Sequence, residues 1–132
     1  MENRPLWVIG EDSGIEVAAL DWGPGVFSAR FGGDDPVGRM LAALKGIEGE
    51  GRRARYTSEL VAVSPDGEEL RGSGALPGRI GHERRGSEGF GYDPIFLPEG
   101  EERTVAELGN AWKRRNSHRS RAARALLEVL GV

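Results

Sequence analysis

Alternating apolar and polar positions predict a long β-hairpin in the middle of the chain. Residues 54–64 alternate broadly, with Tyr56 and Ala62 among the apolar positions, and a second strand is expected within residues 69–80. Residues 65–67, which read Pro-Asp-Gly, are typical of the turn that joins two such strands. The pattern therefore predicts an antiparallel pair here, the clearest in the sequence.

Apolar residues spaced three or four apart predict two main helices. One starts at Asp35 and Pro36, an acid followed by a proline in the first turn. The other is expected from Ser117, a good N-cap, to Leu130. Residues 104–108 carry a shorter helical pattern. The apolar stripes are Met40, Leu41, Leu44 and Ile47 in the first helix, and Ala122, Ala123, Leu126, Leu127 and Leu130 in the last.

The remaining segments predict shorter strands and loops. Residues 6–10 form an apolar run, the polar residues 11–14 break it, and alternation over residues 15–19 indicates a second strand. A turn is expected at residues 23–25, an ordered glycine-rich loop at 81–91 and a short strand at 93–97. Together these elements predict an α/β fold, a mixed curved sheet with a long antiparallel hairpin and flanking helices.

Composition limits the class of protein. The 132 residues suit one domain, residues 1–132, and 38% hydrophobic residues are enough for a modest core. The net charge of the whole chain is -3, which argues against a protein that binds nucleic acid or a membrane surface. Without cysteine, and without an apolar leader at the start, the chain is expected to be cytoplasmic. The first 50 residues are mainly acidic and residues 101–132 mainly basic, so the fold could bring opposite charges together around a ligand.

The break at residues 11–14 places two carboxylates and a hydroxyl side by side. Glu11 and Asp12 offer the oxygen ligands that Mg²⁺ prefers, with room left for substrate phosphates, and one of them could instead orient a water. Ser13 and Gly14 complete the string. A solvated turn is the commoner role of such a string, so the residues alone leave both interpretations open.

A basic cluster near the carboxyl end suggests an anion site. Six basic residues and no acid lie between Lys113 and Arg124. If Ser117 caps the last helix, His118 and Arg119 lie at its amino end, where free N–H groups favour a phosphate. A contact with RNA is the competing interpretation, which the lack of interleaved aromatic residues makes weaker.

A third candidate is the glycine-flanked aromatic segment at residues 87–94. Phe90 or Tyr92 could stack on a base, Gly91 lets the backbone approach a flat ligand, and Asp93 could accept a hydrogen bond from a ring N–H. A structural turn with two core aromatic residues would give the same string.

Four strings occur in a fixed order along the chain. They are E-D-S-G at 11–14, P-G-V-F-S-A-R-F at 24–31, G-F-G-Y-D-P-I-F at 89–96, and S-H-R at 117–119 with a lysine at 113. Together they closely resemble the Ham1 (inosine triphosphate pyrophosphatase) family over essentially the whole chain. The resemblance implies Mg²⁺-dependent hydrolysis of ITP, dITP or XTP to the monophosphate and pyrophosphate.

The resemblance also assigns roles to residues. Asp12 matches the catalytic acid that organises metal and water, and Glu11 is the neighbouring acidic position, so both are expected as metal ligands. Arg30 falls in a family string without a definite role. The remaining matches are expected to bind substrate: Ser13, Phe90, Gly91, Tyr92, Asp93, Lys113, His118 and Arg119.

Family members carry a strand, an asparagine- and lysine-bearing phosphate loop and helices before the E-D-S-G string, whereas this chain begins close to it. We therefore expect a truncated Ham1-like fold whose exposed apolar surface favours a homodimer or higher oligomer. Two further hypotheses follow: a nucleotide-binding protein without turnover, and a subunit completed by a partner chain that supplies the phosphate loop.

Overall fold

A five-stranded antiparallel sheet organises the protein. The computed structural model describes residues 7–25 and 27–131, and the strand order is β2-β1-β3-β4-β5. All four pairings among these residues are antiparallel, so the parallel pairing that a mixed sheet would contain is not among them. The strands are β1 (Val8–Val17), β2 (Gly23–Gly25), β3 (Arg53–Val63), β4 (Glu69–Ile80) and β5 (Phe96–Pro98).

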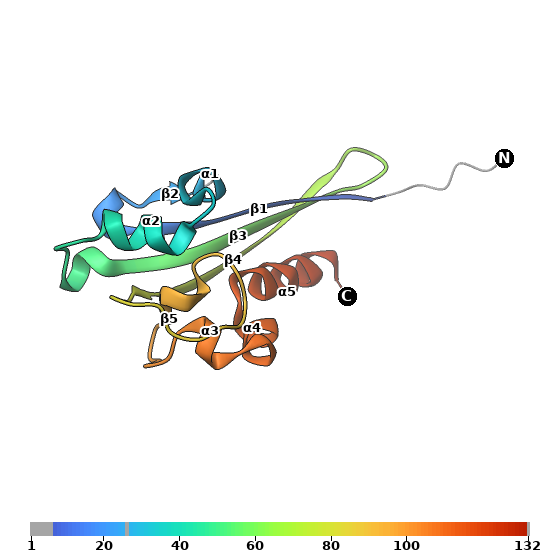
Figure 1. Ribbon diagram of the computed structural model, residues 1–132. Helices are drawn as coiled ribbons and strands as arrows, with labels where there is room; N and C mark the ends of the chain where they lie inside the picture. Colours follow the sequence, from blue (N-terminus) through green and yellow to red (C-terminus); the bar gives the residue numbers. More distant parts are fainter. Residues whose placement is uncertain (1–6, 26, 132) are drawn as a thin grey trace.

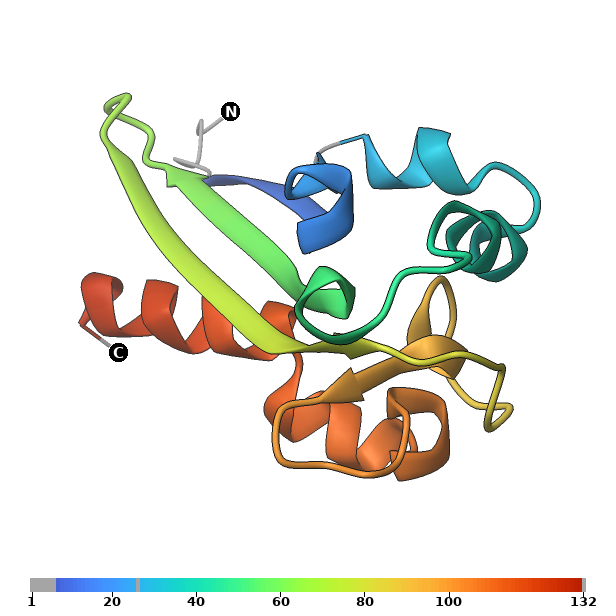
Figure 2. The same cartoon turned by 90° about the vertical axis from the view of Figure 1, so that its left-hand side faces the viewer.

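The helices gather in two groups along the sheet. In Figure 1, α1 and α2 lie at the β2 end, and α3, α4 and α5 lie at the end formed by β4 and β5. Figure 2 shows α5 running along the hairpin strands. The helices are α1 (Ser28–Gly32), α2 (Pro36–Ala43), α3 (Val105–Leu108), α4 (Asn110–Asn116) and α5 (His118–Leu130), with 3-10 turns η1 (Ala18–Leu20), η2 (Gly49–Arg52) and η3 (Asp93–Ile95).

Both groups of helices cover the same face of the sheet. Ile15 on β1 and Tyr56 on β3 share one core with Met40 of α2 and with Phe96 on β5. Because side chains alternate along a strand, this inner face carries residues 11, 13, 15 and 17 of β1, and the outer face carries residues 10, 12, 14 and 16.

The hairpin and the last helix are confirmed. β3 and β4 pair along their whole length, from Arg53 with Arg79 to Val63 with Glu69. Ser117 caps α5, since its Oγ accepts a hydrogen bond from the backbone N–H of Ser120 at 3.1 Å. The α/β architecture with a long antiparallel hairpin is therefore as the sequence predicts.

The predicted break at residues 11–14 is wrong. β1 runs without interruption, and each of its residues pairs with β3, from Val8 opposite Val63 to Val17 opposite Ala54. The ladder gives this polar segment its backbone partners, so a polar string is compatible with a strand. Residue 6, where the sequence predicts this strand to start, lies outside the described residues.

Other differences are local. The expected turn at 23–25 is the short strand β2, which pairs with residues 15–17 of β1. The expected strand at 93–97 starts instead as the 3-10 turn η3 and pairs with β4 only from Phe96. The sequence does not predict α1 or α4, and both are short helices without a clear apolar stripe.

Two glycines set how closely α5 lies on the sheet. Gly72 and Gly74 of β4 face α5, and a Cβ at either position would overlap the backbone of the helix. Glycine is therefore required by close approach at these positions. This packing fixes the height of the amino end of α5, where His118 begins the helix, above β3 and β4.

No helix in residues 7–25 and 27–131 is long and apolar enough to cross a membrane.

Candidate active site

The strand β1 separates the predicted acidic residues. Glu11 and Ser13 lie on the inner face, and Asp12, one residue from each of them, lies on the outer face. A cavity adjoins each face, and Ser13 and Gly14 line both. Along residues 8–14, β1 is paired with β3 on one side only, so among the described residues its other edge is open. The two cavities therefore adjoin at this edge.

The inner cavity brings most of the predicted binding residues together. It has a volume of about 210 Å³ and lies between β1, β3, the 86–92 loop and the start of α5. Seven of the eight residues expected to bind substrate line it from distant parts of the chain, and the eighth, Ser13, lines both cavities. The seven are Phe90, Gly91, Tyr92, Asp93, Lys113, His118 and Arg119.

Asp93 is the hydrogen-bonding centre of this cavity. Its carboxylate is 2% exposed and accepts from the Tyr56 hydroxyl at 3.0 Å, the Lys113 Nζ at 2.5 Å and the backbone N–H of Phe90 at 3.1 Å. These three donors, of which Lys113 is also a cation, compensate a buried charge that would otherwise be costly. Asp93 thus holds two side chains and one backbone N–H, from three segments, in place, and it has few free lone pairs for a ligand.

His118 forms the inner wall of the cavity. Its imidazole is 6% exposed and stacks on the Tyr56 ring, with centroids 4.7 Å apart and planes 11° apart. Burial lowers the pKa of His118 to about 4, and the positive charges of Arg119 and Lys113 act in the same direction. The ring is therefore neutral at pH 7, and its Nδ1 has no hydrogen-bond partner among the described residues.

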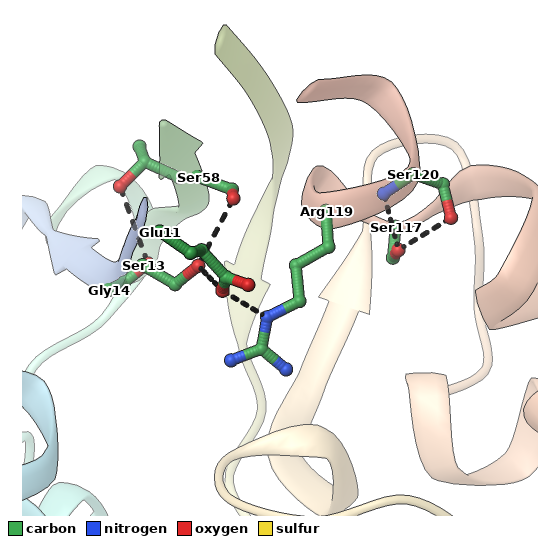
Figure 3. Close-up of polar contacts among 8 residues, drawn as sticks. Glu11, Ser13, Gly14, Ser58, Ser117, Arg119 and Ser120 are labelled. Atoms are coloured by element: carbon green, nitrogen blue, oxygen red, sulfur yellow. Dashed lines mark hydrogen bonds and ion pairs between the residues drawn. The ribbon is translucent and has the colours of Figure 1, made fainter. Parts of the chain in front are cut away.

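Glu11 and Arg119 form an ion pair (Figure 3) beside the inner cavity, which Arg119 lines, and we call this pair the polar mouth of the cavity. Arg119 Nε donates to Glu11 Oε1 at 2.7 Å, and Ser13 Oγ donates to the same oxygen at 2.6 Å. The Ser13 hydroxyl and Arg119 hold the pKa of Glu11 below its usual value. Figure 3 shows the two Nη atoms of Arg119 pointing away from Glu11, and these offer the paired donors that suit a phosphate.

The 86–92 loop presents Phe90 at the surface. The Phe90 ring is 61% exposed, and Lys113 Nζ lies 3.7 Å from its centroid, a cation–π contact. Gly91, with φ of 61°, adopts a left-handed conformation that favours glycine. Tyr92 is buried, and its hydroxyl donates to the Ser28 carbonyl at 2.9 Å, so it anchors the loop to α1 and has no free hydroxyl for a base.

Asp12 lies apart from these residues, in the outer cavity of about 500 Å³. Its partner across the ladder is Glu59, which is held by Arg71 at 2.5 Å. Glu11 and Asp12 point to opposite faces of β1 rather than side by side as the string suggests, and the expectation that both are metal ligands stays a prediction. No three His, Cys, Asp or Glu side chains within residues 7–25 and 27–131 are grouped to hold a metal.

The donor set nevertheless has the chemistry of a Mg²⁺ site completed by substrate. Mg²⁺ is usually bound by one or two carboxylates together with phosphate oxygens and waters. Asp12 can provide one such carboxylate on the outer face, with Glu59 beside it. The residues therefore fit an ion that arrives with a nucleotide better than an ion held by the protein alone.

The basic cluster does not converge on one anion. Lys113 and Arg119 line the inner cavity, whereas Arg121 donates to the Ala75 carbonyl and Arg124 to the Arg115 carbonyl. Arg30, on α1, is exposed and lines neither cavity. Residue 26, inside the same string as Arg30, lies outside the described residues.

Tyr56 is the functional candidate that the sequence did not single out. It lines the inner cavity from β3 and contacts both Asp93 and His118. In the sequence it is an ordinary apolar position of a predicted strand, and no motif marks it.

A sequence profile described as the Ham1 family matches residues 1–129. The dITP/XTP pyrophosphatase of Leifsonia xyli is 42% identical, over 98% of this chain and 67% of its own length, and that of Methylococcus capsulatus is 47% identical, over 95% and 66%. The structure of the Staphylococcus aureus Ham1 protein superposes with a TM-score of 0.87 and 35% sequence identity, over 95% of this chain and 67% of the Staphylococcus aureus chain. The chain spans about two thirds of the length of these relatives.

Proposed function

Because this chain belongs to the Ham1 family, we propose that it hydrolyses ITP, dITP or XTP to the nucleoside monophosphate and pyrophosphate with Mg²⁺. One observation carries the proposal: the predicted binding residues, far apart in sequence, line one cavity beside the polar mouth formed by Glu11 and Arg119. The relatives named dITP/XTP pyrophosphatase support the same substrate class.

In the proposed complex the purine lies in the inner cavity. Its walls are the neutral imidazole of His118 and the Phe90 ring, and both offer flat surfaces to a base. Lys113 and Arg119 supply positive charge between the base and the mouth. Each is already paired with a carboxylate, so the cavity holds polar groups of both signs without a large net charge.

The triphosphate then passes the open edge of β1 toward the outer face. Arg119 can bind phosphate oxygens through its Nη atoms while Nε keeps its bond to Glu11. Ser13 and Gly14 line both cavities, so a chain of phosphates that starts at the mouth reaches the side of β1 that carries Asp12. There Asp12 can orient or deprotonate the attacking water. Bound Mg²⁺ would neutralise negative charge on the phosphates.

A second candidate function is nucleotide binding without turnover. It is favoured by the separation of the two faces: the inner cavity is assembled without Asp12, which lies on the opposite side of β1.

The apolar side chains of Trp7, Val8 and Ile9 are 48–65% exposed, and they support the further proposal that the protein forms an oligomer. A monomeric mass in light scattering would contradict it.

The decisive test compares hydrolysis with binding. We expect pyrophosphate release from ITP, dITP and XTP with Mg²⁺, and little release from ATP or GTP. Asp12→Asn should lose release by at least 10²-fold but still bind nucleotide, because the inner cavity is unchanged. Asp34→Asn is the matched control, since Asp34 is exposed and lines neither cavity. Wild-type binding without release would favour the second function, and full release by Asp12→Asn would exclude the assigned role.

A further inference from the structure

We infer that Tyr56 is a positioning residue of the inner cavity: its ring holds the imidazole of His118, and its hydroxyl holds the Asp93 carboxylate that fixes Lys113 and the Phe90 backbone around the space for a base. The inference deepens the proposed function and rests on it for the identity of the ligand. The positioning itself concerns contacts within this chain and is tested separately below.

Tyr56 occupies the centre of the sheet. It lies on β3 between Ile15 of β1 and Leu76 of β4, on the inner face, and is 8% exposed. Its ring is confined from two directions, stacked on His118 and tilted by 37° against Phe96 with centroids 4.5 Å apart. A side chain on a central strand with two aromatic neighbours has little freedom to move, so it can serve as a reference surface for the groups that touch it.

The hydroxyl of Tyr56 sets the rotation of Asp93. It donates to Oδ1, while Oδ2 accepts from Lys113 Nζ and from the backbone N–H of Phe90. Burial and the nearby Asp93 raise the pKa of Tyr56. The hydroxyl therefore keeps its proton at neutral pH and remains a hydrogen-bond donor to Asp93. The Tyr56 bond thus turns Oδ2 toward the lysine and the loop.

The ring of Tyr56 sets the orientation of His118. The Nδ1 of His118 has no hydrogen-bond partner among the described residues, so no bond at that atom fixes the rotation of the imidazole. The face-to-face stack provides that constraint, together with the position of His118 at the first turn of α5. The charged groups around the imidazole are Arg119, Asp93, Lys113 and Glu11, and none of them is bonded to it in the described residues.

Tyr56 on β3 therefore contacts α5 directly through His118, and it is linked to the 86–92 loop and α4 through Asp93. Because these contacts all lie on the inner face and Asp12 lies on the outer face, loss of Tyr56 contacts should weaken nucleotide binding far more than the chemical step. The expected signature is a raised KM with kcat nearly unchanged. A residue that only stabilised the fold would lower the amount of active protein and leave KM unchanged.

The first experiment follows His118 without any nucleotide. The chain has two histidines, and His82 is exposed, so its ring protons serve as an internal reference in the proton NMR spectrum. The stacked tyrosine ring should shift the His118 ring protons upfield. Tyr56→Phe keeps the stack and should keep this shift, whereas Tyr56→Leu should move the signal toward that of His82. An unchanged His118 signal in folded Tyr56→Leu would overturn the inference.

The second experiment measures dITP hydrolysis and binding of the product dIMP. Tyr56→Phe removes only the hydrogen bond to a charged partner, so KM and the Kd for dIMP should rise about tenfold with kcat nearly constant. Phe96→Leu is the matched control, because Phe96 also packs on Tyr56 but does not line the cavity. An equal rise in Kd for Phe96→Leu would mean a general structural effect and would overturn the inference.

The two proposals fail in different ways. A wild-type protein that binds dIMP but releases no pyrophosphate contradicts the proposed hydrolysis, and the Kd series still tests Tyr56. A wild-type protein that binds no dIMP contradicts the nucleotide site itself, and the His118 signal in Tyr56→Leu then decides whether Tyr56 positions the imidazole.

Discussion

Mild acid should destabilise this protein through His118. The imidazole is buried and its pKa is about 4, whereas an unfolded histidine has a pKa of about 6.5. Between these values the unfolded state binds more protons than the folded state, so stability falls as pH is lowered from about 6.5 to 4 and is flat with respect to this group outside that window. The difference between the two pKa values corresponds to a loss on the order of 3 kcal/mol in the free energy of unfolding.

The contribution of His118 can be isolated by difference. We would measure the free energy of unfolding in urea at several pH values for wild type and His118→Gln, because carboxylates titrate in both proteins and cancel in the subtraction. Wild type should lose on the order of 3 kcal/mol relative to His118→Gln from pH 7.5 to pH 4. His82→Gln is the matched control for loss of a histidine, since His82 is exposed and pairs with Glu48 at 3.2 Å. A wild-type minus His118→Gln difference that stays constant over this range would refute the reasoning.

Three further substitutions test individual contacts. Asp93→Asn leaves Lys113 without its anionic partner in a nearly closed site, so urea unfolding should show a loss of about 3 kcal/mol, and a loss below about 1 kcal/mol would contradict the burial argument. Arg119→Lys removes the paired Nη donors, so calorimetry should show dITP affinity reduced about tenfold. An unchanged affinity would show that these donors do not bind the nucleotide. Ser117→Ala removes the N-cap of α5 and should cost about 1 kcal/mol, whereas a thermal midpoint equal to wild type would show that the cap is dispensable.

The elements that the sequence predicts well are those whose pattern is local. Strand alternation and a Pro-Asp-Gly turn define the hairpin, and Ser117 followed by apolar residues at helical spacing defines α5. The segment at Glu11 and Asp12 is different, because a polar string reads as a turn when its ladder partner, more than forty residues away, is unknown. Only that pairing shows it to be the middle of a strand.

The candidate site was predictable as a set of residues but not as an arrangement. Motif strings name Phe90, Lys113 and His118, and the fold brings them to one cavity. Neighbours in sequence, however, need not be neighbours in a site: Asp12 adjoins Glu11 along the chain and faces the other side of the sheet. Tyr56 was not predicted as a site residue, because the sequence marks it only as an apolar position of a strand. Its role depends on its stacking partner His118, which is distant in sequence.

The close approach of α5 to β4 has a consequence for mutational maps of this protein. Gly72 lines neither cavity and Gly74 borders only the outer one, yet nineteen of the twenty residues would place a Cβ, or a larger group, against the helix backbone at either position. A saturation screen scored by activity should therefore rank these glycines as intolerant alongside the residues of the cavity. A parallel screen scored by abundance would separate these glycines from exposed cavity residues such as Phe90 and Arg119, because substitution of a glycine should deplete folded protein and substitution of an exposed side chain should not.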